Sequence, residues 1–91
     1  MKAHCIFSKK RPHADGMVEM VIWQRPSTDA ERPHGLKYRL VYIVAGKRLV
    51  GYDNEKGKGD HKHFDGKEIK YSFVSVDQLI ADFLTDVRSV S

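Results

Sequence analysis

A chain of 91 residues has room for one domain, residues 1–91, and its 41% hydrophobic content is enough for a packed core, which excludes wholesale disorder. No apolar run approaches the roughly 20 residues that cross a bilayer, the N-terminus does not resemble a signal peptide, and the single Cys5 allows no internal disulfide, so we expect a cytoplasmic protein without a membrane partner. The net charge of +4 is uneven, because residues 1–50 carry ten Lys/Arg against four Asp/Glu, and this excess favours a polyanionic partner.

The first half of the chain predicts β-strands separated by turns. Residues 3–8 are mostly apolar and predict a short strand, with Cys5 as a small buried side chain. Residues 9–16 are basic and contain a proline and an Asp-Gly pair, so they predict a turn. Residues 17–24 are rich in β-branched and aromatic side chains and predict a second strand. Residues 25–35 hold two prolines and predict a loop.

The clearest alternation lies in residues 36–45, which predict a half-buried strand. Lys37 and Arg39 take one face. The other face holds Leu36, Tyr38, Leu40, Tyr42 and Val44. Gly46 then turns the chain, and residues 47–54 return as the partner strand of a hairpin.

The C-terminal segment predicts an amphipathic helix that begins at Ser75. The Ser75 hydroxyl can cap the first turn, with Gln78 reaching back in a capping box. Apolar side chains follow at helical spacing: Val76, Leu79, Ile80, Phe83, Leu84, Val87 and Val90. The sequence therefore predicts an α+β domain, an antiparallel sheet of four to six strands built from hairpins and packed against one C-terminal α-helix.

Residues 51–71 are the most unusual stretch, with two histidines, five carboxylates, five lysines and four glycines. Within this stretch, Asp65-Gly66 is a strong signal for a two-residue hairpin turn. That turn places His63 opposite Glu68 across the hairpin.

The same register places His61 opposite Lys70 and puts both histidines on one side of the hairpin, exposed to solvent. Asp60 and Lys62 take the other side. Glu68 favours the protonated form of His63, and Lys70 disfavours that of His61. We therefore expect His61 to act as a base and His63 as an acid.

A proton acceptor beside a proton donor is what cleavage of an RNA phosphodiester requires, so we expect a small ribonuclease. The catalytic candidates are His61, His63, Glu68 and Asp60. The lysines are candidates for substrate binding and for stabilising the charge of the transition state: Lys56, Lys58, Lys62 and Lys70. Neither a metal nor another cofactor is expected.

Three alternatives remain open at this point. The two histidines are ordinary surface residues, or they bind a metal ion with Asp53, Asp60 or Asp65, or the basic surface binds a partner without catalysis. His4, His13 and His34 have no obvious acidic partner nearby in sequence and are expected to have no functional role. The aromatic side chains at strand positions are expected in the core: Trp23, Tyr38 and Tyr42.

Several motifs resemble the TumE family of toxins from bacterial type II toxin–antitoxin modules. The resemblance runs from about residue 17 to 87. It is strongest in the segments YRL (38–40), GYDNE (51–55) and GKGDHKH (57–63), and it continues through YSFV (71–74). It implies a toxin that is neutralised by a cognate antitoxin, with a helix-turn-helix DNA-binding protein as the expected partner. It implies no particular chemistry for individual residues.

Overall fold

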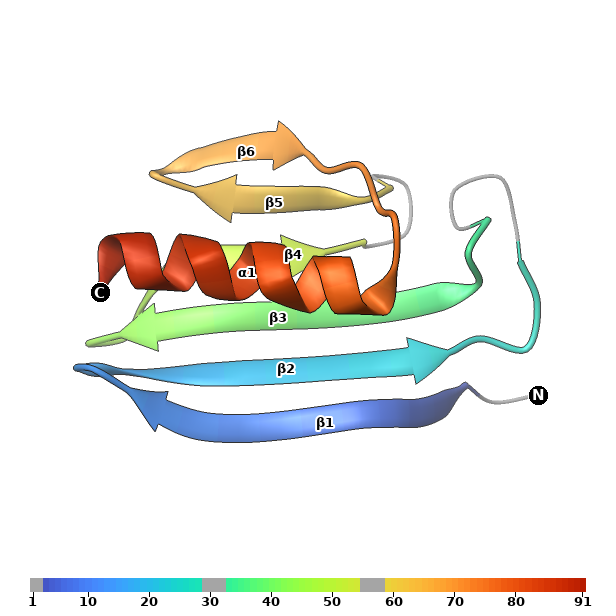
Figure 1. The fold of residues 1–91 in the computed structure, drawn as a ribbon, viewed down its shortest axis with the longest axis horizontal. Coiled ribbons are helices and arrows are strands. Elements are labelled where there is room, and N and C mark those ends of the chain that lie inside the picture. The colour runs from blue at the N-terminus through green and yellow to red at the C-terminus, as the bar shows by residue number, and fades with distance from the viewer. Residues whose placement is uncertain (1–2, 29–32, 55–58) are drawn as a thin grey trace.

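Six antiparallel strands form one sheet in the order β1-β2-β3-β4-β5-β6, and one helix covers one of its faces in the computed structural model, which describes residues 3–28, 33–54 and 59–91 (Figure 1). The elements are β1 (His4–His13), β2 (Gly16–Gln24), β3 (Leu36–Val44), β4 (Lys47–Asp53), β5 (His61–Phe64), β6 (Lys67–Lys70) and α1 (Val76–Val90). The predicted α+β class is confirmed, with six strands at the upper end of the expected range.

Two-residue turns connect the hairpins that the sequence predicted. Ala45 and Gly46 join β3 to β4 with φ values of 49° and 78°. Asp65 and Gly66 join β5 to β6 with φ values of 54° and 73°. Positive φ at both central residues characterises the two-residue hairpin turns whose twist matches that of the paired strands. Glycine adopts a positive φ at no steric cost.

The first strand is longer than predicted. Residues 9–13 continue β1 instead of forming a turn, and the chain reverses only at Ala14 and Asp15, so that His13 pairs with Gly16. Pro12 misled the prediction, because a proline within a strand is tolerated where that strand lies at the edge of a sheet. β1 is such an edge strand.

Cys5 and Trp23 were expected in the core but lie outside it. Cys5 is exposed, because the apolar patch that contains it belongs to the edge strand β1. Ile6 is 52% exposed at an irregularity in the β1–β2 register. Trp23 is half-buried on the sheet face opposite α1, where the Lys37 ammonium lies 5.6 Å from the ring centre.

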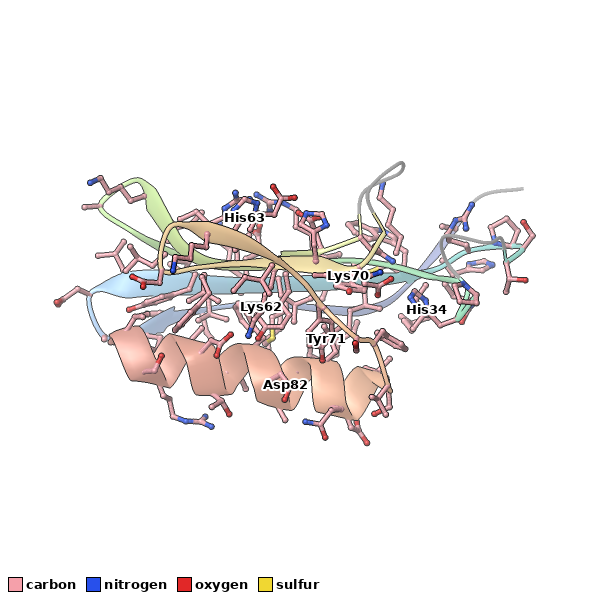
Figure 2. All side chains as sticks on the ribbon, turned by 90° about the horizontal axis from the view of Figure 1, so that it is seen from above. His34, Lys62, His63, Lys70, Tyr71 and Asp82 are labelled. Carbon is pink, nitrogen blue, oxygen red and sulfur yellow. The ribbon has the colours of Figure 1, made fainter. Side chains whose placement is uncertain are left out.

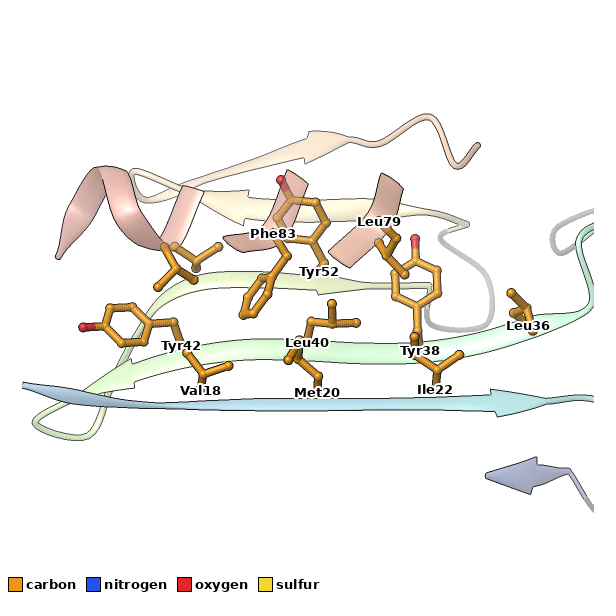
Figure 3. Packing of buried hydrophobic residues seen from close by; sticks show 12 residues of the cluster. Val18, Met20, Ile22, Leu36, Tyr38, Leu40, Tyr42, Tyr52, Leu79 and Phe83 are labelled. Carbon is orange, nitrogen blue, oxygen red and sulfur yellow. The ribbon is translucent and has the colours of Figure 1, made fainter. Parts of the chain in front are cut away.

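The core lies between the sheet and α1 (Figure 3). The predicted alternation in β3 is confirmed, because Tyr38, Leu40 and Tyr42 are each at most 1% exposed. The helix contributes its fully buried stripe: Leu79, Phe83 and Val87. The Phe83 and Tyr52 rings meet edge to face with centroids 5.7 Å apart, which places Phe83 at the centre of the contact.

The helix begins where the sequence placed it. Ser75 is the N-cap, and its Oγ accepts a hydrogen bond of 3.1 Å from the Gln78 backbone N–H. The Gln78 side chain instead donates to Asp82 Oδ1 at 2.7 Å, within the helix. Among the described residues, no helix is long and apolar enough to cross a membrane.

A polar cluster ties the β5–β6 hairpin to the helix and is visible between sheet and helix in Figure 2. Tyr52 donates from its hydroxyl to Asp86 Oδ2 at 2.5 Å, and Lys62 Nζ lies 3.1 Å from the same oxygen. Tyr71 donates to Asp82 Oδ2 at 2.6 Å. These bonds join α1 to Tyr52 of β4, Lys62 of β5 and Tyr71 just after β6, and the Lys62 contact shows which face of β5 is turned toward the helix.

The Tyr52→Phe substitution is expected to lower the free energy of unfolding by roughly 1–3 kcal/mol near pH 7, since a hydrogen bond to a carboxylate is lost. Burial and the hydrogen bond to Asp86 raise the pKa of Tyr52 above its ordinary value. Above about pH 10 the unfolded chain therefore releases a proton that the folded protein keeps, and stability falls as the pH rises. Urea unfolding at pH 7 and 10.5 should show that the free energy of unfolding falls less between these two pH values for the variant than for the wild type. Equal losses would contradict this assignment.

Candidate functional site

Among the described elements, α1 packs on one face of the sheet and none packs on the other, which we call the open face. Strand alternation distributes the side chains of β5 between the two faces. Lys62 and Phe64 point toward the helix side, whereas His61 and His63 lie on the open face. Figure 2 shows His63 on the side of the sheet away from α1 and Lys62 on the near side. The predicted hairpin register is confirmed, because His61 pairs with Lys70 and His63 with Glu68.

His61 is held at both ring nitrogens. Its Nδ1 lies 3.0 Å from the carbonyl oxygen of Gly59, and because a carbonyl can only accept, this nitrogen carries a proton. Its Nε2 lies 2.8 Å from Asp53 Oδ1 and 3.6 Å from Glu68 Oε1. Two carboxylates at Nε2 suit either a doubly protonated ring or a ring whose Nε2 shares a cation with them.

The expectation that both histidines face solvent is wrong for His61, whose side chain is only 7% exposed. The reason is the neighbouring strand: Asp53 on β4 pairs with His61 on β5 and covers it from that side. The ring therefore has a charge partner that the hairpin alone did not reveal. Because removal of this ring breaks its contacts with Gly59, Asp53 and Glu68, His61→Ala is expected to destabilise the fold.

His63 is the more accessible of the two rings, with 30% of its side chain exposed. Its Nε2 lies 3.9 Å from Glu68 Oε2, and the two imidazole centroids are 5.9 Å apart with the rings nearly perpendicular. Ligand-type atoms of His61, His63 and Glu68 all lie within 4.8 Å of one another. The geometry thus gathers two imidazoles around one carboxylate.

Cations edge the pocket that His61 and His63 line. It has a volume of about 410 Å³, and its walls include Lys37 and Arg39 from β3 and Arg48 from β4, beside His61 and His63. Gly51 pairs with His63 and leaves room for Arg48, since a Cβ at this position would lie 2.8 Å from the Arg48 Cδ. The Arg48 side chain therefore crosses β4 toward the histidines, a placement that requires glycine at position 51.

Asn54 fixes the strand end that presents Asp53. Its side chain accepts a hydrogen bond of 3.0 Å from the Tyr38 backbone N–H and donates one of 2.7 Å to the Leu36 carbonyl. Asn54 is fully buried. Because both bonds go to the β3 backbone, the end of β4 is anchored next to the pocket.

Asp60 lies apart from the histidines with which it was grouped. Its Oδ2 accepts a hydrogen bond of 2.7 Å from the Tyr38 hydroxyl, and it lies 3.0 Å from His34 Nε2. Burial and this bond raise the pKa of Tyr38, which keeps its proton and remains a donor. His34 has no acidic partner nearby in sequence, as noted, but Asp60 is distant in sequence and adjacent in space. This contact positions the chain just before β5.

The four predicted substrate-binding lysines fall in different places. Lys70 is exposed on the open face next to His61. Lys62 lies on the helix side with its ammonium 3.1 Å from Asp86 Oδ2. Lys56 and Lys58 lie outside the described residues. The open-face cations that the sequence did not assign to the site are Lys37, Arg39 and Arg48. Strand alternation already placed Lys37 and Arg39 opposite the core, but gave no reason to bring them to the histidines.

A family model described as "Toxin TumE" matches residues 6–91, nearly the whole chain. No curated protein and no solved structure matches it. The family match confirms the resemblance noted from the motifs, and it includes every described residue of the open-face pocket.

Proposed function

Because the chain belongs to the TumE toxin family, which implies an antitoxin partner, we propose that it is a ribonuclease toxin that cleaves RNA in the open-face pocket. The observation that carries the proposal is the convergence of His61 and His63 on Glu68, with both histidines lining a pocket edged by cations. Paired proton-transfer groups beside phosphate-binding cations are what phosphodiester cleavage requires. The reaction would take place in the cytoplasm, where RNA substrates are found.

The proposed roles of the histidines are the reverse of those expected from their hairpin neighbours. Neutral His63 takes the proton of the ribose 2′-hydroxyl, whose oxygen attacks phosphorus. The P–O5′ bond breaks, and the leaving oxygen takes a proton from His61, which in this proposal is the doubly protonated ring with an acceptor at each nitrogen. The products are a 2′,3′-cyclic phosphate and a 5′-hydroxyl. Glu68 orients His63, and Asp60 acts only through the chain segment that it anchors.

The cations around the pocket bind the phosphates in this proposal. Arg48 presents a planar guanidinium group that matches phosphate oxygens, and Lys37 and Lys70 extend the positive surface. Arg39 also lines the pocket and shares its exposed guanidinium with Glu19 at 3.4 Å, an ion pair that a phosphate would have to replace. Binding is therefore expected to weaken as salt rises, because each neutralised phosphate releases counterions. The Lys62 ammonium is directed to Asp86 instead, so its role is structural.

A substrate with one altered ribose tests the reaction directly. Purified protein is incubated with a single-stranded RNA, alone and with ribosomes, and the ends of the products are identified. We expect 2′,3′-cyclic phosphates, and we expect a 2′-deoxyribose at the mapped cleavage position to block cleavage there. An RNA that stays intact in both settings, while the protein still arrests growth, would favour a toxin that binds its target without cleaving it.

A metal-dependent nuclease is the second candidate, and the same cluster supports it. Metal–ligand bonds of about 2.0–2.2 Å place two ligands of one ion about 3–4 Å apart, so atoms already within 4.8 Å need only small rotations. The bond from His61 Nδ1 to the Gly59 carbonyl is the kind that orients a metal-binding imidazole. Bound there, a divalent ion would supply an activated water and charge stabilisation.

Treatment with excess chelator separates the two candidates. Under the acid–base proposal, RNA cleavage and the melting temperature are expected to be unchanged, because no ion contributes to either. Under the metal proposal, both are expected to fall and to recover when a divalent ion is added back. If the 2′-deoxy substrate is cleaved once a divalent metal is added, that result would likewise contradict the acid–base proposal.

The cognate antitoxin is proposed to be a helix-turn-helix DNA-binding protein encoded next to the toxin. Such a protein represses its own operon while it neutralises the toxin. Its reading frame is expected beside this gene, and its expression is expected to restore growth. Growth that is restored by an unrelated kind of protein would contradict this assignment.

A further inference from the structure

A groove on the helix side of the sheet, far from the histidine pocket, has the features of a protein-binding surface. It has a volume of about 280 Å³ and lies between α1 and the first two strands. Its lining residues are Phe7, Lys9, Arg11, His13, Val18, Met20, Ile80, Leu84, Val87 and Arg88. We refer to it as the basic groove.

The basic groove exists because one helix is too narrow for a six-stranded sheet. The helix packs mainly on β4, and its ribbon does not pass over β1 and β2 in the view onto the helix (Figure 1). Helices that pack side by side lie about 8–10 Å apart, which equals two strand spacings of about 4.8 Å. A second helix beside α1 would therefore lie over β2, where the groove is. Within the described part of the chain, no segment occupies that position.

The groove has an apolar floor and walls suited to such a helix. Val18 and Met20 of β2 form the floor. On the helix side, Ile80 and Leu84 are only partly buried, although they belong to the apolar stripe of α1. Phe7 on β1 is partly buried in the same way. Apolar side chains left half-covered at a groove mark a contact with a partner more than a surface for RNA, which prefers stacking and polar groups.

The charges at the rims specify the flanks of the partner. Lys9 and Arg11 stand on the β1 rim, and Arg88 stands on the α1 rim. Among the described residues that line the groove, none is acidic. A partner helix that lies between these rims would meet positive charge on both sides. A helix with complementary charge therefore carries Asp or Glu on both flanks of its apolar stripe.

We propose that the basic groove is the antitoxin-binding site and accepts an acidic amphipathic helix of the antitoxin. The antitoxin helix lies beside α1 on the same face of the sheet and binds by laying its apolar side into the groove. The groove and the histidine pocket are on opposite faces of the sheet. The inference rests on membership of a toxin family and not on the proposed ribonuclease activity.

The test reverses the rim charges. The triple variant Lys9→Glu, Arg11→Glu, Arg88→Glu is compared with Lys10→Glu, which changes the neighbouring position of β1 whose side chain points to the opposite face. The probe is the purified protein that restores growth when it is produced together with the wild-type toxin. We expect its dissociation constant to rise about 100-fold or more for the triple variant and less than about 3-fold for Lys10→Glu.

Growth provides the second readout and reports whether the variant folds. The triple variant is expected to arrest growth like the wild type and to remain toxic in the presence of the antitoxin. Neutralisation that persists with unchanged affinity would overturn the proposal. It would also be overturned if the triple reversal weakened RNA binding but not antitoxin binding, or if it converted a toxin dimer to monomers with antitoxin affinity unchanged. Neither readout depends on RNA cleavage, so a non-cleaving toxin leaves the test intact.

Discussion

Replacing Phe83 with alanine is expected to lower the free energy of unfolding by about 3–5 kcal/mol, measured by urea unfolding at pH 7. Phe83 is 0% exposed and meets Tyr52 at the centre of the contact between helix and sheet. Its removal leaves a cavity where, in the described part of the chain, one helix covers the sheet. The free energy of unfolding of a domain is about 5–15 kcal/mol in total, so the expected loss is a large fraction of its stability.

Val90→Ala is the matched control, because Val90 belongs to the same apolar stripe but is 38% exposed near the end of α1. Its effect is expected to stay within about 0.5 kcal/mol. Phe83→Leu keeps most of the buried volume and should remain folded if the alanine variant does not. A loss below about 1 kcal/mol for Phe83→Ala would mean that the helix is not the main cover of the sheet.

The parts of the fold that depend on local patterns were predictable from the sequence. The alternation from Leu36 to Val44 identified the core face of β3, and Asp65-Gly66 fixed the β5–β6 register. Ser75 marked the start of α1 to the residue. In each case the information lies within a few residues, because strand periodicity, turn geometry and capping are local properties.

The errors concern the position of an element in the sheet, which local patterns do not carry. The apolar residues next to Cys5 in sequence are typical of a buried position, and the residues around Pro12 are typical of a turn. Both residues nevertheless belong to an edge strand. An edge strand has one side without a neighbour, so apolar side chains stay exposed there and a proline is accommodated. Trp23 was misplaced for a related reason, since its strand is inside the sheet but its face is the open one.

The site shows the same division between local and long-range information. The pairing of His63 with Glu68 followed from the turn between them. The pairing of Asp53 with His61 joins β4 to β5, and the connection between those strands carries no register signal of its own. Asp53 changes the chemistry most, because it places a carboxylate at His61 where Lys70 was expected to dominate. Hence the sequence predicted that the two histidines share one side of the hairpin, but not the Asp53 contact from which their proposed roles are argued.

His63→Ala is expected to lower the rate of RNA cleavage by about 10²–10⁴-fold, the usual contribution of a single group that transfers a proton. The ring is partly exposed and its nearest carboxylate contact, with Glu68, is 3.9 Å long, so its removal is expected to cost less than about 1 kcal/mol of stability. Cleavage is measured with the single-stranded RNA described above. Loss of growth arrest is expected to accompany it.

His13→Ala is the control for a histidine outside the pocket, because His13 contacts Ser91 near the end of the chain. It should leave the cleavage rate within about 2-fold of wild type. His61→Ala is less informative alone, since the buried ring also supports the fold through Gly59 and Asp53. A folded His63→Ala variant that cleaves RNA at the wild-type rate would remove the proton-transfer role. If that variant still arrested growth without any RNA cleavage, the pocket would be a binding site, and its cations would be the groups that carry toxicity.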